Sequence, residues 1–171
     1  MMEIEVQHYQ KQWPVLFEIE QSNIKAILNG EVIKIHHIGS TAVENLKAKP
    51  IIDMLVVVTN IEKIDEYNKL FMKLGYISLG ENGITGRRFF KKGENPRTHH
   101  MHIFQQDKIY EINRHIAVRD YLREHEVIAR EYEQLKEQLA QKFPDDRQGY
   151  CDGKDSFMKK LEQAALTWYL K

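Results

Sequence analysis

The stretch that decides the fold reads VIKIHHIGSTAVENLKAKPIIDMLVVV over residues 32–58. Its two apolar, β-branched runs, 32–38 and 51–58, predict strands that are buried on both faces. One acid, Asp53, lies inside the second run, where an unpaired buried carboxylate is costly. Because side chains alternate along a strand, Asp53 shares a face with Leu55 and Val57. We therefore expect its carboxylate to meet whatever covers that face.

The Gly39-Ser40 turn ends the first of these runs and precedes a short helix expected over 41–46. Free N–H groups at such a turn, together with the dipole of the helix, favour an anion such as phosphate. The same pair also suits any turn that needs φ freedom and a capping hydroxyl. Its place ahead of an acid-bearing strand favours phosphate binding by Gly39 and Ser40, and Lys49 could reach the same phosphate from the loop before Asp53.

Length and charge limit the classes of protein to consider. The 171 residues fit one domain, 1–171, which can bury about 70% of its unfolded surface. Because 25 basic residues balance 25 acidic ones, a general nucleic-acid or membrane-surface binder is not expected. The lone Cys151 cannot form an internal disulfide, which favours a reducing compartment. With no signal-peptide pattern at the N-terminus, we expect a cytoplasmic protein.

The apolar periodicity outside the central stretch predicts an α+β domain, with a mixed sheet covered on one side by helices and a C-terminal helical portion. Gly- and Asn-bearing turns separate the predicted strands, and Pro144 breaks the helical second half. Helices are expected over 13–29, 61–74, 118–143 and 155–170, and short strands over 76–79, 87–91 and 101–104.

A run of histidines, 98-THHMH-102, follows in the sequence. On a strand, His100 and His102 point the same way, about 7 Å apart at the backbone. If that strand lies beside the one that carries Asp53, the three side chains form a mixed N/O site that suits zinc, manganese or iron better than magnesium. Structural histidines at a strand edge would explain the same residues. His37, just before the turn, could join the pocket or simply bond to backbone.

Two arginines, Arg87 and Arg88, open a basic strand with aromatic residues interleaved. Because neighbouring side chains alternate, one of the two can face a pocket while the other is solvated. The planar fork of a guanidinium suits a polyphosphate. Solvated charges that protect an edge strand from aggregation are the alternative. Both Arg87 and Arg88 are candidate phosphate ligands on this pattern.

The residues 37-HIGSTAV-43, with Leu46 and 48-AKPIID-53, resemble the signature of the GrpB family within the nucleotidyltransferase-fold superfamily. That superfamily combines a Gly-Ser turn with a following strand that carries Asp-x-Asp and with a third carboxylate on a later strand. This chain keeps the turn and the first acid, but Leu55 stands at the position of the second. Glu111 or another distant acid would have to supply the missing charge.

The resemblance implies a nucleotidyltransferase-like fold that binds a nucleoside triphosphate or another phosphate ligand over the Gly-Ser turn. Asp53 would be the catalytic acid and would hold a divalent metal, Mg²⁺ or Mn²⁺, or Zn²⁺ if the histidines take part. A nucleotidyl group would then pass to an unknown acceptor. The missing second acid favours a non-catalytic nucleotide-binding module instead, and the histidine pair favours a small metal-binding protein or hydrolase. The expected partner is a nucleotide or phosphorylated small molecule, with no general nucleic acid and no membrane.

Overall fold

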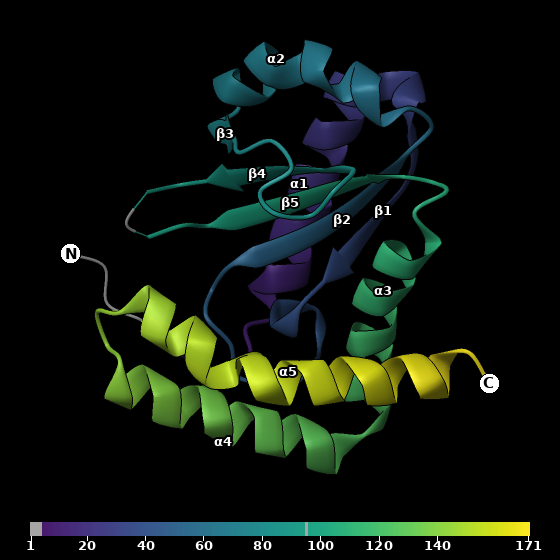
Figure 1. The fold of residues 1–171 in the computed structure, drawn as a ribbon. Helices are drawn as coiled ribbons and strands as arrows, with labels where there is room; N and C mark the ends of the chain where they lie inside the picture. The colour runs from purple at the N-terminus through teal and green to yellow at the C-terminus, as the bar shows by residue number, and fades with distance from the viewer. Residues whose placement is uncertain (1–4, 95) are drawn as a thin grey trace.

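The two apolar runs become adjacent strands in the computed structural model, which describes residues 5–94 and 96–171 (Figure 1). Strand β1 (Val32–Ile38) pairs antiparallel with β2 (Ile52–Val58), so that Ile38 lies opposite Asp53. The predicted strand boundaries differ from these by one residue at most. Both faces of β2 are buried, as its apolar composition predicts.

Three more strands complete a mixed sheet in the order β1-β2-β5-β4-β3. Strand β5 (His99–Gln105) runs parallel to β2 and places His100 opposite Asp53. The remaining strands, β4 (Arg87–Lys92) and β3 (Tyr76–Ser78), add antiparallel pairs at the far edge. The start of β2, the start of β5 and the end of β1 therefore meet at one end of the sheet.

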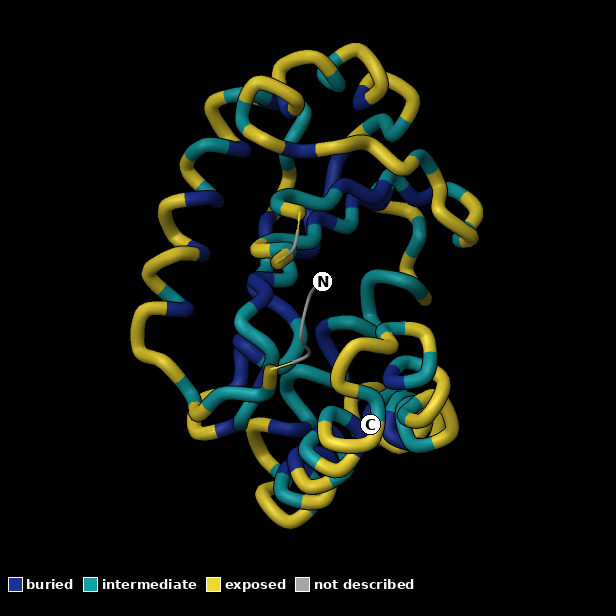
Figure 2. Tube along the Cα trace, turned by 90° about the vertical axis from the view of Figure 1, so that its left-hand side faces the viewer, coloured by how far each residue is buried: buried dark blue, intermediate teal, exposed yellow. Residues whose placement is uncertain are grey.

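Helices cover both faces of the sheet, rather than the single face expected from the sequence. On one face lies α1 (Gln12–Leu28), whose buried side Figure 2 shows turned toward the sheet. The 3₁₀ segment η3 (Ile61–Tyr67) and α2 (Asn68–Lys73) extend this layer. On the other face, α3 (Ile109–Glu124) packs over Leu55. The α+β class with a C-terminal helical portion is confirmed.

The last two helices, α4 (Glu126–Lys142) and α5 (Arg147–Tyr169), cross the end of the sheet where β1 ends (Figure 1). They pack with α3 around a second apolar cluster that includes residues of the Gly-Ser segment. This cluster contains Val43, Leu46, Leu122, Ala129, Tyr132 and Leu161. The helices therefore form a cover over the turn. No helix within 5–94 and 96–171 has the length and apolar character that crossing a membrane requires.

The predicted boundaries of the C-terminal helices were wrong. The helix expected over 118–143 is two helices, because His125 leaves the helical conformation at φ −127° and ψ 81°. The apolar stripe continues through that break, so periodicity alone does not reveal it. Helix α5 begins eight residues before the predicted start at 155, where the Asp146 carboxylate caps it by accepting from the Gly149 N–H. Gly153 disfavours a helix in the sequence and so obscured this first part of α5. In the structure the position suits glycine, because a Cβ there would clash with the Leu139 side chain.

Candidate functional site

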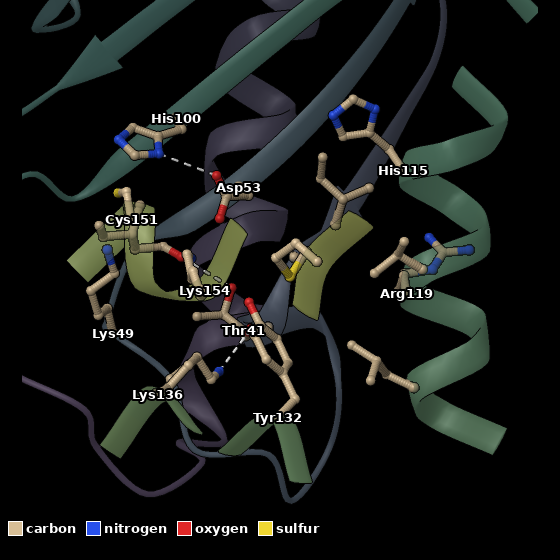
Figure 3. A pocket seen from close by; sticks show the side chains of 18 of the residues that line it. Thr41, Lys49, Asp53, His100, His115, Arg119, Tyr132, Lys136, Cys151 and Lys154 are labelled. Carbon is tan, nitrogen blue, oxygen red and sulfur yellow. Dashed lines mark hydrogen bonds and ion pairs between the residues drawn. The ribbon is translucent and has the colours of Figure 1, made fainter. Parts of the chain in front are cut away.

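A cavity of about 370 Å³ lies at the end of the sheet, beneath the cover formed by α3, α4 and α5 (Figure 3). Its walls come from the Gly39-Ser40 turn, the loop before β2, the first residues of β2 and β5, and the three helices. This volume falls within the range of small-molecule sites. The sequence features singled out around residue 53 therefore border a real cavity.

Asp53 faces this cavity from β2, and β5 brings both predicted histidines to it. Asp53 Oδ1 lies 3.3 Å from His100 Nδ1 and 3.7 Å from His102 Nε2. Burial alone would raise the pKa of Asp53, but the contacts with His100 and His102 outweigh burial and lower it below its ordinary value. The carboxylate is therefore held as an anion. The structure brings together the three residues that the sequence predicts to converge.

Gly39 lets the turn close onto this carboxylate. Its φ of +73° belongs to the region that favours glycine, and a Cβ at this position would lie 2.7 Å from Asp53 Oδ2. The helix expected over 41–46 is only one 3₁₀ turn, Ser40–Ala42, because Val43 returns to an extended conformation. The helix dipole invoked for phosphate binding is accordingly absent at this turn. The positive charge beside Ser40 is instead that of a lysine side chain.

This lysine is Lys136, from α4. Its Nζ donates hydrogen bonds to Ser40 Oγ at 2.9 Å and to the Lys47 carbonyl at 2.7 Å, and lies 4.4 Å from the centroid of the Tyr132 ring. Burial, and then the nearby charge of Lys154, lower the pKa of Lys136 to about 7. The sequence does contain a signal for a buried Lys136, because this lysine lies on the apolar stripe of its helix, four residues after Tyr132. The many other lysines of the helical half make that signal easy to miss.

Cationic side chains outnumber acids in the cavity wall by six to two. Two of the six are neutralised: Arg114 pairs with Glu111 and Glu162, and Arg119 with Asp120. The other four form no ion pair with any carboxylate in the described part of the chain, although Asp53 lies among them. These four, which we call the cation cluster, are Lys49, Lys136, Arg147 and Lys154.

Two lysines of this cluster, Lys49 and Lys154, lie near the ring of Tyr150 in α5. The Lys49 ammonium lies 4.6 Å from the centroid of the Tyr150 ring, and that of Lys154 lies 5.3 Å from it. Burial, followed by the charges of Lys154 and Arg147, lowers the pKa of Lys49 to about 8. The Tyr150 hydroxyl is buried and has no hydrogen-bond partner among the described residues. Tyr150 itself lines the cavity, and an unpartnered buried hydroxyl calls for an explanation such as a water or a ligand that accepts from it.

The other candidates from the sequence lie outside the cavity wall. His37 points toward α1: its Nε2 lies 2.9 Å from Thr41 Oγ1, and its ring stacks on Phe17 at 4.8 Å. Burial lowers the pKa of His37 to about 4, so the ring is neutral. Its partner is a hydroxyl instead of the backbone group expected for a histidine at a strand end. His37 thus contacts the turn through Thr41, on the side away from the cavity.

The two arginines divide as the alternation predicts, but neither lines the cavity. Arg88 lies on the opposite face of the sheet and forms a two-pronged ion pair with Asp65, at 2.7 and 3.3 Å. Arg87 lies on the Asp53 face, where its guanidinium donates to the carbonyls of Glu81 and Asn82 and lies 3.2 Å from His102 Nδ1. Apart from Lys49, in the loop before β2, the cations in the cavity wall come instead from the helical cover.

Of the expectations from the sequence, the metal site has the least support from the geometry of the side chains. No group of three or more His, Cys, Asp or Glu side chains within residues 5–94 and 96–171 is arranged to hold an ion. Asp53 Oδ1 is occupied by contacts with the imidazoles, and Glu111 is held by Arg114. The donors present therefore do not fit a divalent ion as they stand. The metal role of Asp53, His100 and His102 stays a prediction.

These features define a class: a small α+β domain whose mixed sheet ends in a cation-lined cavity closed by a Gly-Ser turn and a helical cover. The chain belongs to the GrpB family, whose model, described as GrpB protein, matches residues 3–164. It is 46% identical over 165 residues to the protein YqkA of Bacillus subtilis (strain 168). The alignment spans 96% of this chain and 48% of YqkA, so the chain corresponds to about half the length of that relative.

One solved structure agrees with this assignment. The crystal structure of the conserved protein GrpB from Enterococcus faecalis superposes with a TM-score of 0.95 at 49% identity, covering 98% of this chain and all of that one. The Cid1 poly(U) polymerase aligns with 77% of this chain and 44% of its own, at a TM-score of 0.45 and 8% identity. That second likeness is too remote to support any statement about activity.

Proposed function

We propose that this chain binds a phosphate-bearing small molecule in the cavity beneath the Gly39-Ser40 turn, with a nucleotide as the leading candidate. The observation that carries the proposal is the cation cluster. Its four side chains come from the loop before β2, from α4 and from α5, yet all line one cavity without carboxylate partners among the described residues. A fold gains nothing from gathering unpaired cations, since their mutual repulsion and burial cost stability.

The energetics favour an anion of more than one charge. Two unit charges about 4 Å apart interact by about 4 kcal/mol at the effective dielectric of a partly buried site. The lowered pKa values of Lys49 and Lys136 mean that these amines are already largely desolvated in the folded protein. A phosphate entering the cavity would offset part of that penalty, and the unpartnered Tyr150 hydroxyl would add a donor.

Binding without nucleotidyl transfer is the better supported version of this function. Transfer of a nucleotidyl group relies on metal ions held by more than one carboxylate. Leu55, at the place of the second acid, is fully buried, and Glu111 is held by Arg114. Nucleotidyl transfer is the second candidate, favoured by the closure of Gly39 onto Asp53, which matches the superfamily's turn-and-acid pattern.

Titration calorimetry with ATP, GTP, CTP, UTP and inorganic phosphate, each with excess EDTA or with Mg²⁺ or Mn²⁺, tests the proposal. We expect binding in EDTA, weakened about tenfold or more by Lys49→Met or Lys136→Met, since the loss of one charge-assisted contact is worth about 1.5–3 kcal/mol. Lys159→Met is the matched control, because Lys159 is exposed on α5 and pairs with Asp155. Absence of binding by every probe would reject the proposal.

Two further measurements separate the alternatives. Pyrophosphate release from a nucleoside triphosphate that disappears in Asp53→Asn would establish transfer over simple binding. Asp53→Asn should leave phosphate binding in place if the cation cluster is the anion site. Elemental analysis of protein purified without an affinity tag decides the metal-binding or hydrolase alternative, because a bound ion in near-stoichiometric amount is its requirement.

A further inference from the structure

The arginine contacts behind the two cavity histidines determine where each imidazole carries its proton. Arg97 Nη1 lies 3.4 Å from His100 Nε2 in hydrogen-bonding geometry. A guanidinium can only donate, so His100 Nε2 must be the acceptor. The single ring proton of His100 then lies on Nδ1, the atom 3.3 Å from Asp53 Oδ1.

The same reasoning applies to His102 with its ring nitrogens exchanged. Arg87 Nη1 donates to His102 Nδ1 at 3.2 Å, which leaves the proton on Nε2. That nitrogen lies 3.7 Å from the same Asp53 oxygen, too far for a good hydrogen bond but close enough for charge–dipole attraction. Two neutral histidines thus turn N–H groups toward one carboxylate, each from a different ring position.

We propose that Arg97 and Arg87 are positioning residues that fix His100 and His102 as neutral N–H donors to Asp53, so that the carboxylate is held in the cavity without a metal ion. Ligation of an ion shared with Asp53 would require lone pairs on His100 Nδ1 and His102 Nε2. Those two atoms carry the protons in this arrangement. The lone pairs point away from the cavity, toward the guanidinium groups.

This arrangement also gives Asp53 a role toward a ligand, a step that rests on the proposed function. Oδ1 is occupied by the histidines, whereas the other oxygen points away from His100 in Figure 3 and lies beside Gly39. An anionic acceptor among cations would select a ligand that carries a hydroxyl or amino donor besides its phosphate. The substrate class is then a phosphorylated molecule with such a donor, for instance a sugar phosphate or a nucleotide through its ribose.

Nitrogen NMR of protein labelled with ¹⁵N-histidine tests the tautomers directly, in excess EDTA and at alkaline pH. Two-bond ¹H–¹⁵N correlations should show His100 protonated at Nδ1 and His102 at Nε2. His115 and His125 are internal references, because their Nδ1 atoms donate to the carbonyls of Glu111 and Tyr121 at 2.7 and 2.8 Å. The opposite tautomer at either cavity histidine would overturn the proposal.

Variants of Arg97 separate a positioning role from a structural one. Arg97→Met should lower the fraction of His100 protonated at Nδ1, although Asp53 still favours that tautomer, while Arg97→Lys, which keeps a donor, should retain the single tautomer. Unchanged shifts in Arg97→Met would show that Arg97 does not fix the ring. Arg87 also bonds to two carbonyls and its loss could unfold β4, so Arg97 is the variant of choice. Neither readout depends on a ligand, so the tautomers and the proposed function can fail separately.

Amide replacements supply the final comparison. The Asn amide nitrogen imitates an imidazole Nδ1–H and the Gln amide nitrogen imitates Nε2–H, so His100→Asn with His102→Gln keeps both donors and removes both imidazole ligands. This double variant should bind inorganic phosphate or ATP in EDTA with less than about a tenfold change, about 1.4 kcal/mol. If Zn²⁺ or Mn²⁺ binds the wild type stoichiometrically, shifts both histidines and is lost in the double variant, a metal site replaces the one proposed.

Discussion

Lys136 in α4 donates a 2.9 Å hydrogen bond to Ser40 Oγ, 96 positions earlier in the sequence. Its second bond, to the Lys47 carbonyl, joins the same ammonium to the loop before β2. The side chain is 2% exposed and has no carboxylate partner among the described residues. One buried charge therefore links the helical cover to the turn, and its proton should respond to both pH and ligand.

Stability should rise with pH above neutrality. Burial, and then Lys154, lower the pKa of Lys136 from 10.5 to about 7, and the pKa of Lys49 is lowered in the same way to about 8. Between about pH 7 and 9, below the range in which tyrosines of the unfolded chain lose protons, the unfolded chain therefore binds more protons than the folded one, and the free energy of unfolding increases with pH. For one such lysine, the increase is about 1.4 kcal/mol per pH unit at most. Urea unfolding across this range measures the slope.

Lys136→Met should flatten this slope without abolishing it, because Lys49 still titrates. Lys159→Met, on the exposed surface, should leave it unchanged. A wild-type stability that falls between about pH 7 and 9, or a Lys136→Met slope equal to that of the wild type in this range, would mean that Lys136 keeps an ordinary pKa in the folded state.

Phosphate binding should have the opposite pH dependence. An anion beside Lys49 and Lys136 favours their charged forms, so binding takes up protons wherever the free amines are partly neutral. We expect affinity for inorganic phosphate to decrease as pH rises above about 7. Calorimetry in two buffers of different ionisation enthalpy would reveal the proton uptake. Equal heats in both buffers at pH near 8 would contradict it.

Gly39→Ala should destabilise the protein by about 2–4 kcal/mol, combining backbone strain at φ +73° with a Cβ placed 2.7 Å from Asp53 Oδ2. Gly80→Ala separates the two causes: Gly80 has φ +61°, but a Cβ added there would meet nothing within 4 Å, so this variant should lose only about 1 kcal/mol. Chemical denaturation of both variants measures the difference. Equal losses would mean that the closure onto Asp53 has no energetic weight.

The central sheet could be predicted because its signals are local. The β-branched runs around Asp53 specify β1 and β2, and alternation places Leu55 and Asp53 on one face, as the structure has them. The break at His125 could not be predicted, because it contains neither Pro nor Gly and interrupts no apolar periodicity. Both α3 and α4 pack against α5, and a tertiary constraint of this kind leaves no local pattern in the sequence.

The two halves of the site differ in the same way. Asp53, His100 and Gly39 were predictable from strand alternation and turn chemistry. Apart from Lys49, which the sequence already placed beside the turn, the cations that line the cavity come from helices whose packing no local pattern in the sequence indicates. Lys136 resembles a solvated helix residue unless its place on the apolar stripe is noticed. Arg88 is a residue whose chemistry suggested the site but whose position excludes it. Its guanidinium suits a phosphate, but the alternation of side chains along β4 places it on the other face of the sheet, where it pairs with Asp65.

Tyr150→Phe should stabilise the free protein and weaken its ligand binding. The Tyr150 hydroxyl is buried and unpartnered within the described chain, a situation that costs about 1–3 kcal/mol, and removing the oxygen leaves the packing of the ring intact. Because Tyr150 lines the cavity, we expect a bound phosphate ligand to accept from this hydroxyl, so its loss should also lower affinity for such a ligand by roughly tenfold. Thermal unfolding and calorimetry measure the two effects. Tyr169→Phe, at an exposed position near the end of α5, should change neither. A Tyr150→Phe protein that is less stable than the wild type would mean that the hydroxyl has a partner in the folded protein and is not held ready for a ligand.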